Sequence, residues 1–432
     1  MISITLLNHA AVIIELGEIR LLCDPWFEGS CFSGGWGLKY NNSNAMDEIK
    51  SCTHLWVSHF HGDHFHVPTL KRILDVNPDI CVLGNTSYNF QLDGAMRSLG
   101  FANIVQVQER RELSLSSTVS IKRYPATGID NMLVIKSPFG TVLNFNDCNI
   151  PHKARKWLAS QLGFIDIFLT NFNHASKLID YPKRSPDQIK TEMSQRFTSI
   201  CNSFQTKWII PFASHHTYLA PESEDQNASL MTVDEIAKLD SKVVPLQVGQ
   251  KVSFAEAGFD LVKTNSVSLN QTTLINRQHS TSLEAVKKSF EGYRSRINNR
   301  FFYLTYLIPQ LVIQLVDHDC NLSFSFYNGM REIPQDSNKA HISAHSSCLE
   351  ECFSKNYGTD SFWVGGHFDL LSPRLAPLRW QLLVSLMIEN RVDLVSLVGC
   401  LFSFKGWQFL WCRREEILSI LLSSQIAIGS RD

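Results

Sequence analysis

Short apolar runs separated by turn residues dominate the first part of the chain, and this pattern predicts β-strands. The predicted strands lie at 2–7, 11–16, 19–23, 51–57, 80–83, 104–108, 119–124, 133–137, 142–145, 165–169, 251–254 and 261–262, with one more from 208 that ends in a histidine pair. Helices are expected over 67–74, where Pro68 occupies the first turn, and over 88–99. Alternation of strands and helices, with a hairpin turn at 138–140, predicts a mixed-sheet α/β layer fold.

The last third of the chain has a different pattern. A polar stretch at 265–281 is a predicted linker, so we expect a first domain at 1–265 and a smaller α+β domain at 282–432. The predicted elements of the second domain are strands at 301–316, 322–327 and 362–370 and a helix at 380–390. In the same region His341, His345, Cys348 and Cys352 follow one helical stripe, which either binds a metal or, more commonly, is a half-buried helix face.

Composition narrows the class of protein. A chain of 432 residues with 44% hydrophobic and 19% charged residues predicts a folded, soluble protein of two domains. The formal net charge of -1 argues against a nucleic-acid binder, and the most apolar windows, 301–316 and 392–411, are too interrupted to predict a membrane span. No signal peptide is visible, and the 11 cysteines contain no Cys-x-x-Cys pair, so a reducing, cytoplasmic location is expected.

A histidine-rich motif follows the predicted strand at 51–57. His59 and His61 are two positions apart and point the same way on an extended backbone, and Gly62 permits a turn that brings Asp63 and His64 to a second point. Neutral imidazole and ionised carboxylate are donors that borderline divalent metals prefer. The alternative, a solvated loop with chance histidines, does not account for this spacing behind an apolar strand, so the motif predicts a metal site.

Further candidate residues stand at or near the ends of other predicted strands. They are Asp130, Asp147, His174, His215 and His216. Two of them have a purely structural alternative. Asp147 also fits an Asx turn, and His174 also fits a helix cap or a core position. A long loop at 28–45, rich in glycine, serine and asparagine, is expected to cover a substrate with Trp36 and Tyr40.

The His-x-His-x-Asp-His motif resembles the metallo-β-lactamase superfamily, whose members are αββα sandwiches with one or two metals at the rim between two sheets. The resemblance implies that Asp147 bridges two cations, because an anion between them reduces their repulsion. It also implies a histidine within 124–131, and none is present. Asp130 is the expected substitute, which favours iron or manganese over zinc; the alternatives are an incomplete first metal position or a contribution from His174. His215 is expected to complete the ligands with His216 beside it, although a shift of one residue would exchange the two.

Two N-terminal segments carry a more distant resemblance. Asn8-His9-Ala10 and Leu22-Cys23-Asp24-Pro25-Trp26 are similar to the branch of ascorbate-6-phosphate-lactonase-like and N-acylphosphatidylethanolamine-phospholipase-like proteins. The resemblance implies that His9 and Asp24 support the metal ligands by hydrogen bonds. An ordinary turn aspartate before a proline remains the alternative for Asp24.

The nearest resemblance is to CMP-N-acetylneuraminate hydroxylase-like proteins that lack the Rieske domain. It is carried by 58–86, by Asp130-Asn131, by 142–148 and by 211–213, and more weakly by the C-terminal half. This chain contains no Cys-x-His…Cys-x-x-His sequence of a Rieske centre. A separate electron donor is therefore expected.

This resemblance implies a dinuclear non-haem iron oxygenase, a hydroxylase that acts on a small molecule with dioxygen as co-substrate. One iron would be held by His59, His61 and Asp130, and the other by Asp63, His64 and His215. Asp147 would bridge them, and Asp147, His174 and His216 are the expected catalytic residues.

Two other functions are weighed against the oxygenase. The first is a hydrolase of the same fold that cleaves a phosphodiester, lactone or amide with a metal-bound water. The second is a binding protein with a vestigial site, which the full set of ligand candidates disfavours.

Overall fold

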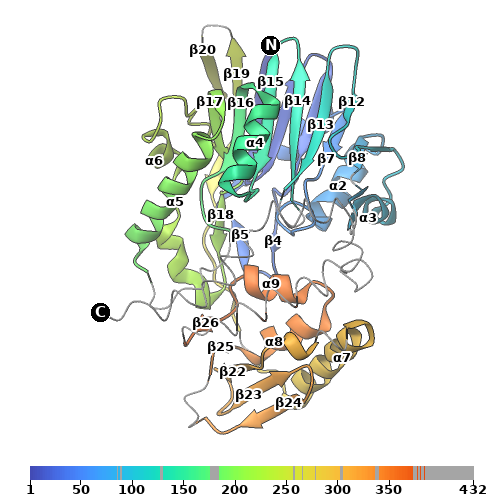
Figure 1. The fold of residues 1–432 in the computed structure, drawn as a ribbon. Coiled ribbons are helices and arrows are strands. Elements are labelled where there is room, and N and C mark those ends of the chain that lie inside the picture. Colours follow the sequence, from blue (N-terminus) through green and yellow to red (C-terminus); the bar gives the residue numbers. More distant parts are fainter. Residues whose placement is uncertain are drawn as a thin grey trace.

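The computed structural model describes residues 1–84, 86, 87, 90–126, 130–175, 184–255, 258–264, 266–277, 279–301, 305–335, 340–372, 377, 380 and 384. Two large β-sheets are stacked face to face, and helices cover the outer face of each (Figure 1). The first sheet has the strand order β11-β8-β7-β3-β2-β1-β19-β20. Its strands are β1 (Ile2–Asn8), β2 (Ala11–Leu16), β3 (Ile19–Cys23), β7 (His54–Trp56), β8 (Cys81–Gly84), β11 (Ile104–Gln106), β19 (Gln250–Ala255) and β20 (Gly258–Lys263).

The second sheet has the order β12-β13-β14-β15-β16-β17. Its strands are β12 (Glu112–Ser114), β13 (Ser120–Pro125), β14 (Asn131–Ser137), β15 (Gly140–Asn146), β16 (Phe164–Asn171) and β17 (Gln205–Phe212). In the first sheet β3, β7, β8 and β11 are parallel, and in the second β15, β16 and β17 are parallel. Because carboxyl ends of parallel strands meet at one edge, the loops that follow β3, β7, β15 and β17 can share one rim.

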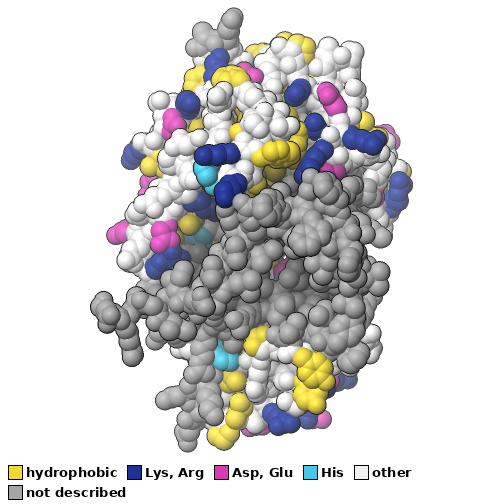
Figure 2. All heavy atoms as spheres, in the orientation of Figure 1, with side chains coloured by type: hydrophobic (Ala, Val, Ile, Leu, Met, Phe, Trp, Pro, Cys, Tyr) yellow, Lys and Arg dark blue, Asp and Glu magenta, His cyan; other side chains and the backbone are white. Residues whose placement is uncertain are grey.

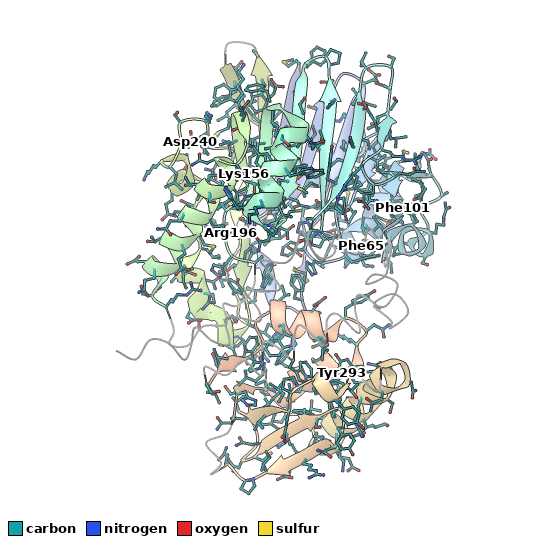
Figure 3. All side chains as sticks on the ribbon, viewed as in Figure 1. Phe65, Phe101, Lys156, Arg196, Asp240 and Tyr293 are labelled. Carbon is teal, nitrogen blue, oxygen red and sulfur yellow. The ribbon has the colours of Figure 1, made fainter. Side chains whose placement is uncertain are left out.

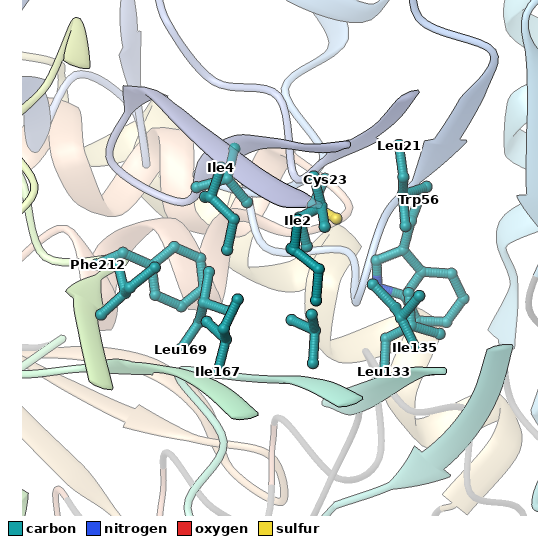
Figure 4. Packing of buried hydrophobic residues seen from close by; sticks show 14 of the residues in the cluster. Ile2, Ile4, Leu21, Cys23, Trp56, Leu133, Ile135, Ile167, Leu169 and Phe212 are labelled. Atoms are coloured by element: carbon teal, nitrogen blue, oxygen red, sulfur yellow. The ribbon is translucent and has the colours of Figure 1, made fainter. Parts of the chain in front are cut away.

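The main hydrophobic core fills the space between the two sheets. Ile4, Leu21 and Trp56 of the first sheet face Leu133 and Leu169 of the second, and all five are at most 1% exposed (Figure 4). Because every second side chain of a strand points into this core, apolar residues recur with the period of a strand, and the strands could be predicted from the sequence.

Helices cover both outer faces of the sandwich. On the first sheet lie α1 (Ala45–Ile49), α2 (Val67–Val76) and α3 (Leu92–Leu99), packed through a second core. Phe101, which follows α3, lies buried on this side of the molecule (Figure 3). On the second sheet lie α4 (His152–Leu162), α5 (Pro186–Cys201) and α6 (Val233–Ala237). The predicted fold class is confirmed: the layers are αββα, as in the metallo-β-lactamase fold.

Short elements close the end of the sandwich. They are β4 (Ser30–Cys31), β5 (Trp36–Leu38), β6 (Tyr40–Asn42), β9 (Thr86–Ser87), β10 (Phe90–Gln91), β18 (His216–Tyr218), β21 (Val267–Leu269) and the 3-10 helix η1 (Pro221–Ser229). β5 pairs with β4 and β18, and β6 pairs with β21. The prediction of a long loop at 28–45 is therefore wrong, because three short strands lie there, of which β5 and β6 pair with the distant strands β18 and β21.

The C-terminal residues build a separate core around a sheet of order β24-β23-β22-β25-β26. Its elements are α7 (Leu283–Phe301), η2 (Thr305–Leu307), β22 (Leu311–Leu315), β23 (Asn321–Ser325), β24 (Gly329–Ile333), β25 (Ile342–Ala344), α8 (Ser346–Ser354), α9 (Gly358–Val364) and β26 (Asp369–Leu370). Tyr293 of α7 is buried in this core (Figure 3). The α+β character agrees with the expectation, whereas the domain limits 1–265 and 282–432 stay a prediction.

Several C-terminal expectations are wrong. Among the described residues of the predicted strand 301–316, only Leu311–Leu315 form a strand, and most of 362–370 belongs to helix α9 and the turn after it. The stripe from His341 to Cys352 is not one helix, since β25 intervenes and His345 caps the N-terminus of α8. A short apolar run has no clear periodicity, so the sequence pattern alone does not distinguish a strand from a helix, and this explains the wrong assignments. The predicted helix at 380–390 lies almost entirely outside the described residues.

In the part of the chain that the structure describes, every helix is too short or too polar to cross a bilayer. On the described surface in Figure 2, basic and acidic side chains are interspersed over the sandwich.

Candidate metal centre

The candidate ligands converge on the rim where β3, β7 and β15 end. Four residues at or beside strand ends on this rim have positive φ angles: His9 (25°), Asp24 (44°), Asn146 (59°) and Ala213 (50°). Residues other than glycine rarely adopt this conformation, and it costs on the order of 1–3 kcal/mol where it occurs. The strained backbone conformations, which cost folding free energy, therefore lie where polar side chains point into the site.

The first half of the site consists of His59, His61 and Asp147, whose ligand atoms lie within 4.8 Å of one another. His59 Nε2 is 2.8 Å from His61 Nδ1 and 3.8 Å from Asp147 Oδ2. Asp130 Oδ1 also lies 3.8 Å from His59 Nε2. The structure therefore brings all four predicted residues of this half together, including Asp130.

The second half consists of His9, Asp63 and His64, again within 4.8 Å. Asp63 Oδ2 is 3.2 Å from His9 Nε2 and 3.2 Å from His64 Nε2. His9, which was expected to act only through hydrogen bonds, thus stands where a ligand would stand.

One carboxylate oxygen lies between the two halves. Asp147 Oδ2 is 3.8 Å from His59 Nε2 and 3.5 Å from His64 Nε2. Because a single anionic oxygen faces donors of both groups, the arrangement is that of a dinuclear site with a shared carboxylate.

Asp24 is fully buried beneath the site and holds it in place. Its Oδ1 accepts hydrogen bonds from the backbone N–H (2.7 Å) and the hydroxyl (2.9 Å) of Ser58, and its Oδ2 accepts one from Asn146 Nδ2 (2.8 Å). Asp24 Oδ2 also lies 3.6 Å from His64 Nδ1, so it orients the ring whose other nitrogen faces the ligands. The position of Asp24 matches the supporting role that the resemblance implied.

Two supporting residues were missed by the sequence analysis. Asn131 donates from Nδ2 to the carbonyl of Ser58 (2.9 Å) and accepts from Arg123 Nη1 (2.8 Å). Arg123 is only 1% exposed. A buried arginine and amide are visible in the sequence only as polar residues within strands, so their partners could not have been deduced.

The side chains present fit bound cations. His64 Nε2, Asp63 Oδ1 and Asp147 Oδ1 are buried without a hydrogen-bond partner in the described part of the chain. Unsatisfied buried polar atoms of this kind are costly unless a ligand satisfies them. Imidazole nitrogen and carboxylate oxygen facing one another are the donors of zinc, iron and manganese sites.

The electrostatics agree with this interpretation. Burial, and then repulsion from His64, hold the pKa of His59 well below its ordinary value, so the ring is neutral and able to bind a metal. Burial alone would raise the pKa of Asp147, but the nearby His64 outweighs it and holds that pKa below its usual range. Asp147 is therefore an anion between the two groups.

The histidine pair after β17 divides differently from the expectation. His215 packs between the rings of Tyr40 and Phe172, at centroid distances of 5.8 and 5.7 Å. His216 stacks on Trp36 at 4.0 Å and lies 5.5 Å from the ring of His9. The structure thus places His216 nearer the second half of the site, and ligation by His215 stays a prediction that this geometry does not support.

His174 lies apart from the ligands. Its Nε2 is 2.8 Å from Ser229 Oγ, and its Nδ1 is 2.9 Å from the hydroxyl of Tyr218. Both ring nitrogens are thus engaged by other residues, and the predicted contact of His174 with a substrate gains no support from the geometry.

The fold and the site together define a metallo-β-lactamase-type sandwich with a centre for two metal ions. No protein-family model matches the chain. It is similar to the cytidine monophosphate-N-acetylneuraminic acid hydroxylase of Danio rerio (25% identical over 314 residues, 69% of this chain and 52% of the relative). It is also similar to a Mycolicibacterium smegmatis protein whose name assigns it provisionally to the Rieske 2Fe-2S iron–sulfur proteins (27% identical over 241 residues, 52% of this chain and 46% of the relative).

Similar solved structures include both hydroxylases and hydrolases. One is CmlA, a diiron β-hydroxylase from Streptomyces venezuelae (TM-score 0.40, 20% identity, 55% of this chain and 50% of that chain). Another is the isothiocyanate hydrolase from Delia radicum gut bacteria (TM-score 0.42, 15% identity, 59% of this chain and 99% of that chain). The predicted resemblance to the hydroxylase proteins is confirmed, and the chain spans about half the length of the curated relatives it matches.

Proposed function

We propose that this protein is a dinuclear non-haem iron oxygenase that hydroxylates a small molecule with dioxygen and electrons from a separate donor. The observation that carries the proposal is the carboxylate content of the site. Asp130 and Asp147 each place an oxygen 3.8 Å from His59 Nε2, and Asp63 places one 3.2 Å from His64 Nε2. Anionic oxygen donors favour iron over zinc and stabilise its higher oxidation states.

Each residue has a defined task in this proposal. His59, His61 and Asp130 would hold one iron, Asp63 and His64 would hold the other with His9 as a third donor, and Asp147 would lie within reach of both. Bound iron supplies the reduction of dioxygen. Asp24 keeps His64 oriented through their 3.6 Å contact, and the buried positions of His59, His64 and Asp63 exclude bulk water from the ligands.

In this proposal His216, rather than His215, would stand beside the second iron, because its ring lies 5.5 Å from that of His9. Its ring nitrogens have no hydrogen-bond partner in the described residues, and the ring is held flat on Trp36. Burial, and then the neighbouring His9, hold the pKa of His216 well below its ordinary value, so the ring is neutral and keeps a nitrogen lone pair for a metal.

The reducing compartment expected from the sequence is part of the proposal. The 9 cysteines that the structure describes form no disulfide with one another. Free thiols agree with a cytoplasmic location, where an electron donor would also be available. The resemblance to Rieske-type relatives supports an iron–sulfur protein as that donor.

A metal-dependent hydrolase is the second candidate. The histidines His9, His59, His61 and His64 offer nitrogen donors to the two halves, and such donors suit zinc equally well. Zinc at this position would lower the pKa of a bound water and present hydroxide to a phosphodiester, lactone or amide.

One preparation distinguishes the two functions. The protein is purified without added metal, analysed for iron, manganese and zinc, and then loaded with ferrous iron under nitrogen. Two equivalents of iron with dioxygen consumption that requires a reductant support the oxygenase. Zinc in the purified protein, together with turnover of a generic phosphodiester and no dioxygen uptake, contradicts it.

The Asp130→His substitution gives a sharper test. Histidine keeps a donor near His59, so metal content is expected to persist while reductant-dependent dioxygen uptake falls. Unchanged dioxygen chemistry would remove Asp130 from the site. Asp166→Asn is the matched control, because Asp166 is a carboxylate on β16 of the second sheet and, among the described residues, accepts a hydrogen bond from the backbone N–H of Thr141 (2.7 Å).

A further inference from the structure

A tyrosine is buried next to the metal centre with its hydroxyl hydrogen-bonded to a histidine. Tyr218 of β18 is 0% exposed and His174 is 3% exposed. The hydroxyl of Tyr218 lies 2.9 Å from His174 Nδ1, and the two rings are nearly parallel at a centroid distance of 5.6 Å. The metal ligands leave this pair without a role, and a buried polar pair of this kind is costly to build.

The hydrogen bonds of Ser229 and His174 determine which atom is the donor in the hydrogen bond between Tyr218 and His174. The hydroxyl of Ser229 donates its single hydrogen to the backbone carbonyl of Gln226 (2.7 Å), and a carbonyl cannot donate in return. Ser229 Oγ therefore accepts from His174 Nε2, 2.8 Å away, so Nε2 carries the hydrogen. In a neutral ring Nδ1 is then an acceptor, and the Tyr218 hydroxyl donates to it.

Aromatic rings connect Tyr218 to the ligands without a break. The ring of Tyr218 is 5.7 Å from that of Trp36 and 5.2 Å from that of His216. Trp36 and His216 are stacked at 4.0 Å, and His216 is 5.5 Å from His9. His9 Nε2 is in turn 3.2 Å from Asp63 Oδ2, inside the candidate centre.

We propose that Tyr218 is a redox-active residue that supplies one electron to the metal centre, with His174 as the acceptor of its proton. The inference rests on the proposed oxygenase function, because dioxygen reacting at the centre is the oxidant. One electron leaves the phenol for the oxidised centre through the Trp36–His216 stack, and the O–H proton crosses the 2.9 Å hydrogen bond to His174 Nδ1. The products are a neutral tyrosyl radical, an imidazolium and a centre reduced by one electron.

A second electron transfer, from a different source, restores the tyrosine and the neutral histidine. An electron from the reductant that supports turnover reduces the radical, and the proton returns from His174 Nδ1 to the phenolate oxygen. The pair thus stores one oxidising equivalent away from the ligands when no substrate is present to receive it. Transfer of the proton along an existing hydrogen bond makes oxidation of a fully buried phenol feasible, since no uncompensated buried charge is left on the tyrosine.

Tyr40 provides a control within the same site. It lies on β6, its ring is 5.8 Å from His215, and it is half-buried. In the described residues its hydroxyl makes no hydrogen bond to a histidine, so it has no comparable proton acceptor.

The experiment uses the full chain. It is loaded with ferrous iron under nitrogen, the iron content is measured, and the protein is mixed with dissolved dioxygen in the absence of any substrate and frozen for electron paramagnetic resonance. We expect an organic radical signal whose hyperfine pattern changes when the protein contains ring-deuterated tyrosine and does not change with deuterated tryptophan. Exchange into D₂O should replace the hydrogen-bonded proton by deuterium and thereby narrow the radical signal.

Variants assign the radical. Tyr218→Phe, which removes one oxygen atom, is expected to bind the same amount of iron and to lose the signal, whereas Tyr40→Phe keeps it. A wild-type protein that binds iron and consumes dioxygen without a tyrosyl signal overturns the inference alone, as does an undiminished signal in Tyr218→Phe. A protein that takes up no iron or consumes no dioxygen overturns the proposed function, and this inference with it.

Discussion

The shared carboxylate is the residue whose loss should change the centre most. In Asp147→Asn the side chain keeps its shape and one oxygen, but the negative charge between the two groups disappears. The oxygen that faces both halves lies 3.5 Å from His64 Nε2 and 3.8 Å from His59 Nε2, so the charge acts at short range on whatever cations these rings hold.

The size of the effect follows from Coulomb's law. Two unit charges about 4 Å apart interact by about 4 kcal/mol at an effective dielectric constant of about 20. A loss of about 4 kcal/mol corresponds to about a thousandfold weaker binding. Two cations without the bridging anion also repel each other, so the second ion to bind should suffer most.

The assay is anaerobic titration of the metal-free protein with ferrous iron, followed by calorimetry and by elemental analysis after gel filtration. Wild type is expected to retain two ions, and Asp147→Asn one at most. Near-ultraviolet circular dichroism checks that the variant is folded, and Asp166→Asn is expected to bind like wild type. Retention of two ions by Asp147→Asn with unchanged affinity would refute the bridging position.

Three further predictions concern the support of the site and the stability of the fold. Asp24→Asn should weaken metal binding by about 10–100-fold, the usual cost of losing a group that orients a ligand, and equal affinity would exclude Asp24 from that task. Glu222→Gln should lower the free energy of unfolding by about 3–5 kcal/mol, because it leaves Arg277 without its mostly buried partner at 2.7 Å, and urea unfolding with no loss would contradict this. Asp317→Asn should lower the free energy of unfolding by about 1.5–3 kcal/mol at pH 7, because Asp317 accepts hydrogen bonds from Ser346 at the N-terminus of α8.

The Asp317 prediction has a definite pH dependence. Burial raises the pKa of this carboxyl, but hydrogen bonds from the hydroxyl and backbone N–H of Ser346 outweigh it and lower the folded pKa. A carboxylate with a lowered folded pKa contributes stability in full above its unfolded pKa of about 3.9, and loses it as the pH falls through the folded value. The difference between wild type and Asp317→Asn should therefore be constant near neutral pH and vanish in strong acid. A difference that grows on acidification would contradict the assigned cause.

Much of the sandwich could be predicted from local pattern alone. The strands β1, β2 and β3 and helix α2 match the predicted runs closely, because each alternates its apolar residues toward a core or carries its own start signal. The C-terminal unit was harder: the apolar run at 362–370 predicts a strand, but its first three residues belong to helix α9, where Phe362 and Trp363 are buried. Helix α7, with its polar residues spread over a long segment, was missed.

The sequence by itself determined the metal motif, because His59, His61, Asp63 and His64 are close along the chain and their chemistry allows few other uses. Tertiary structure decided everything that depends on distant strands meeting at a rim. It brought His9 from the first turn to Asp63, placed His216 rather than His215 beside it, and paired Tyr218 with His174. A shift of one residue in a strand reverses the direction of a side chain, and no local pattern specifies which of two adjacent histidines faces inward.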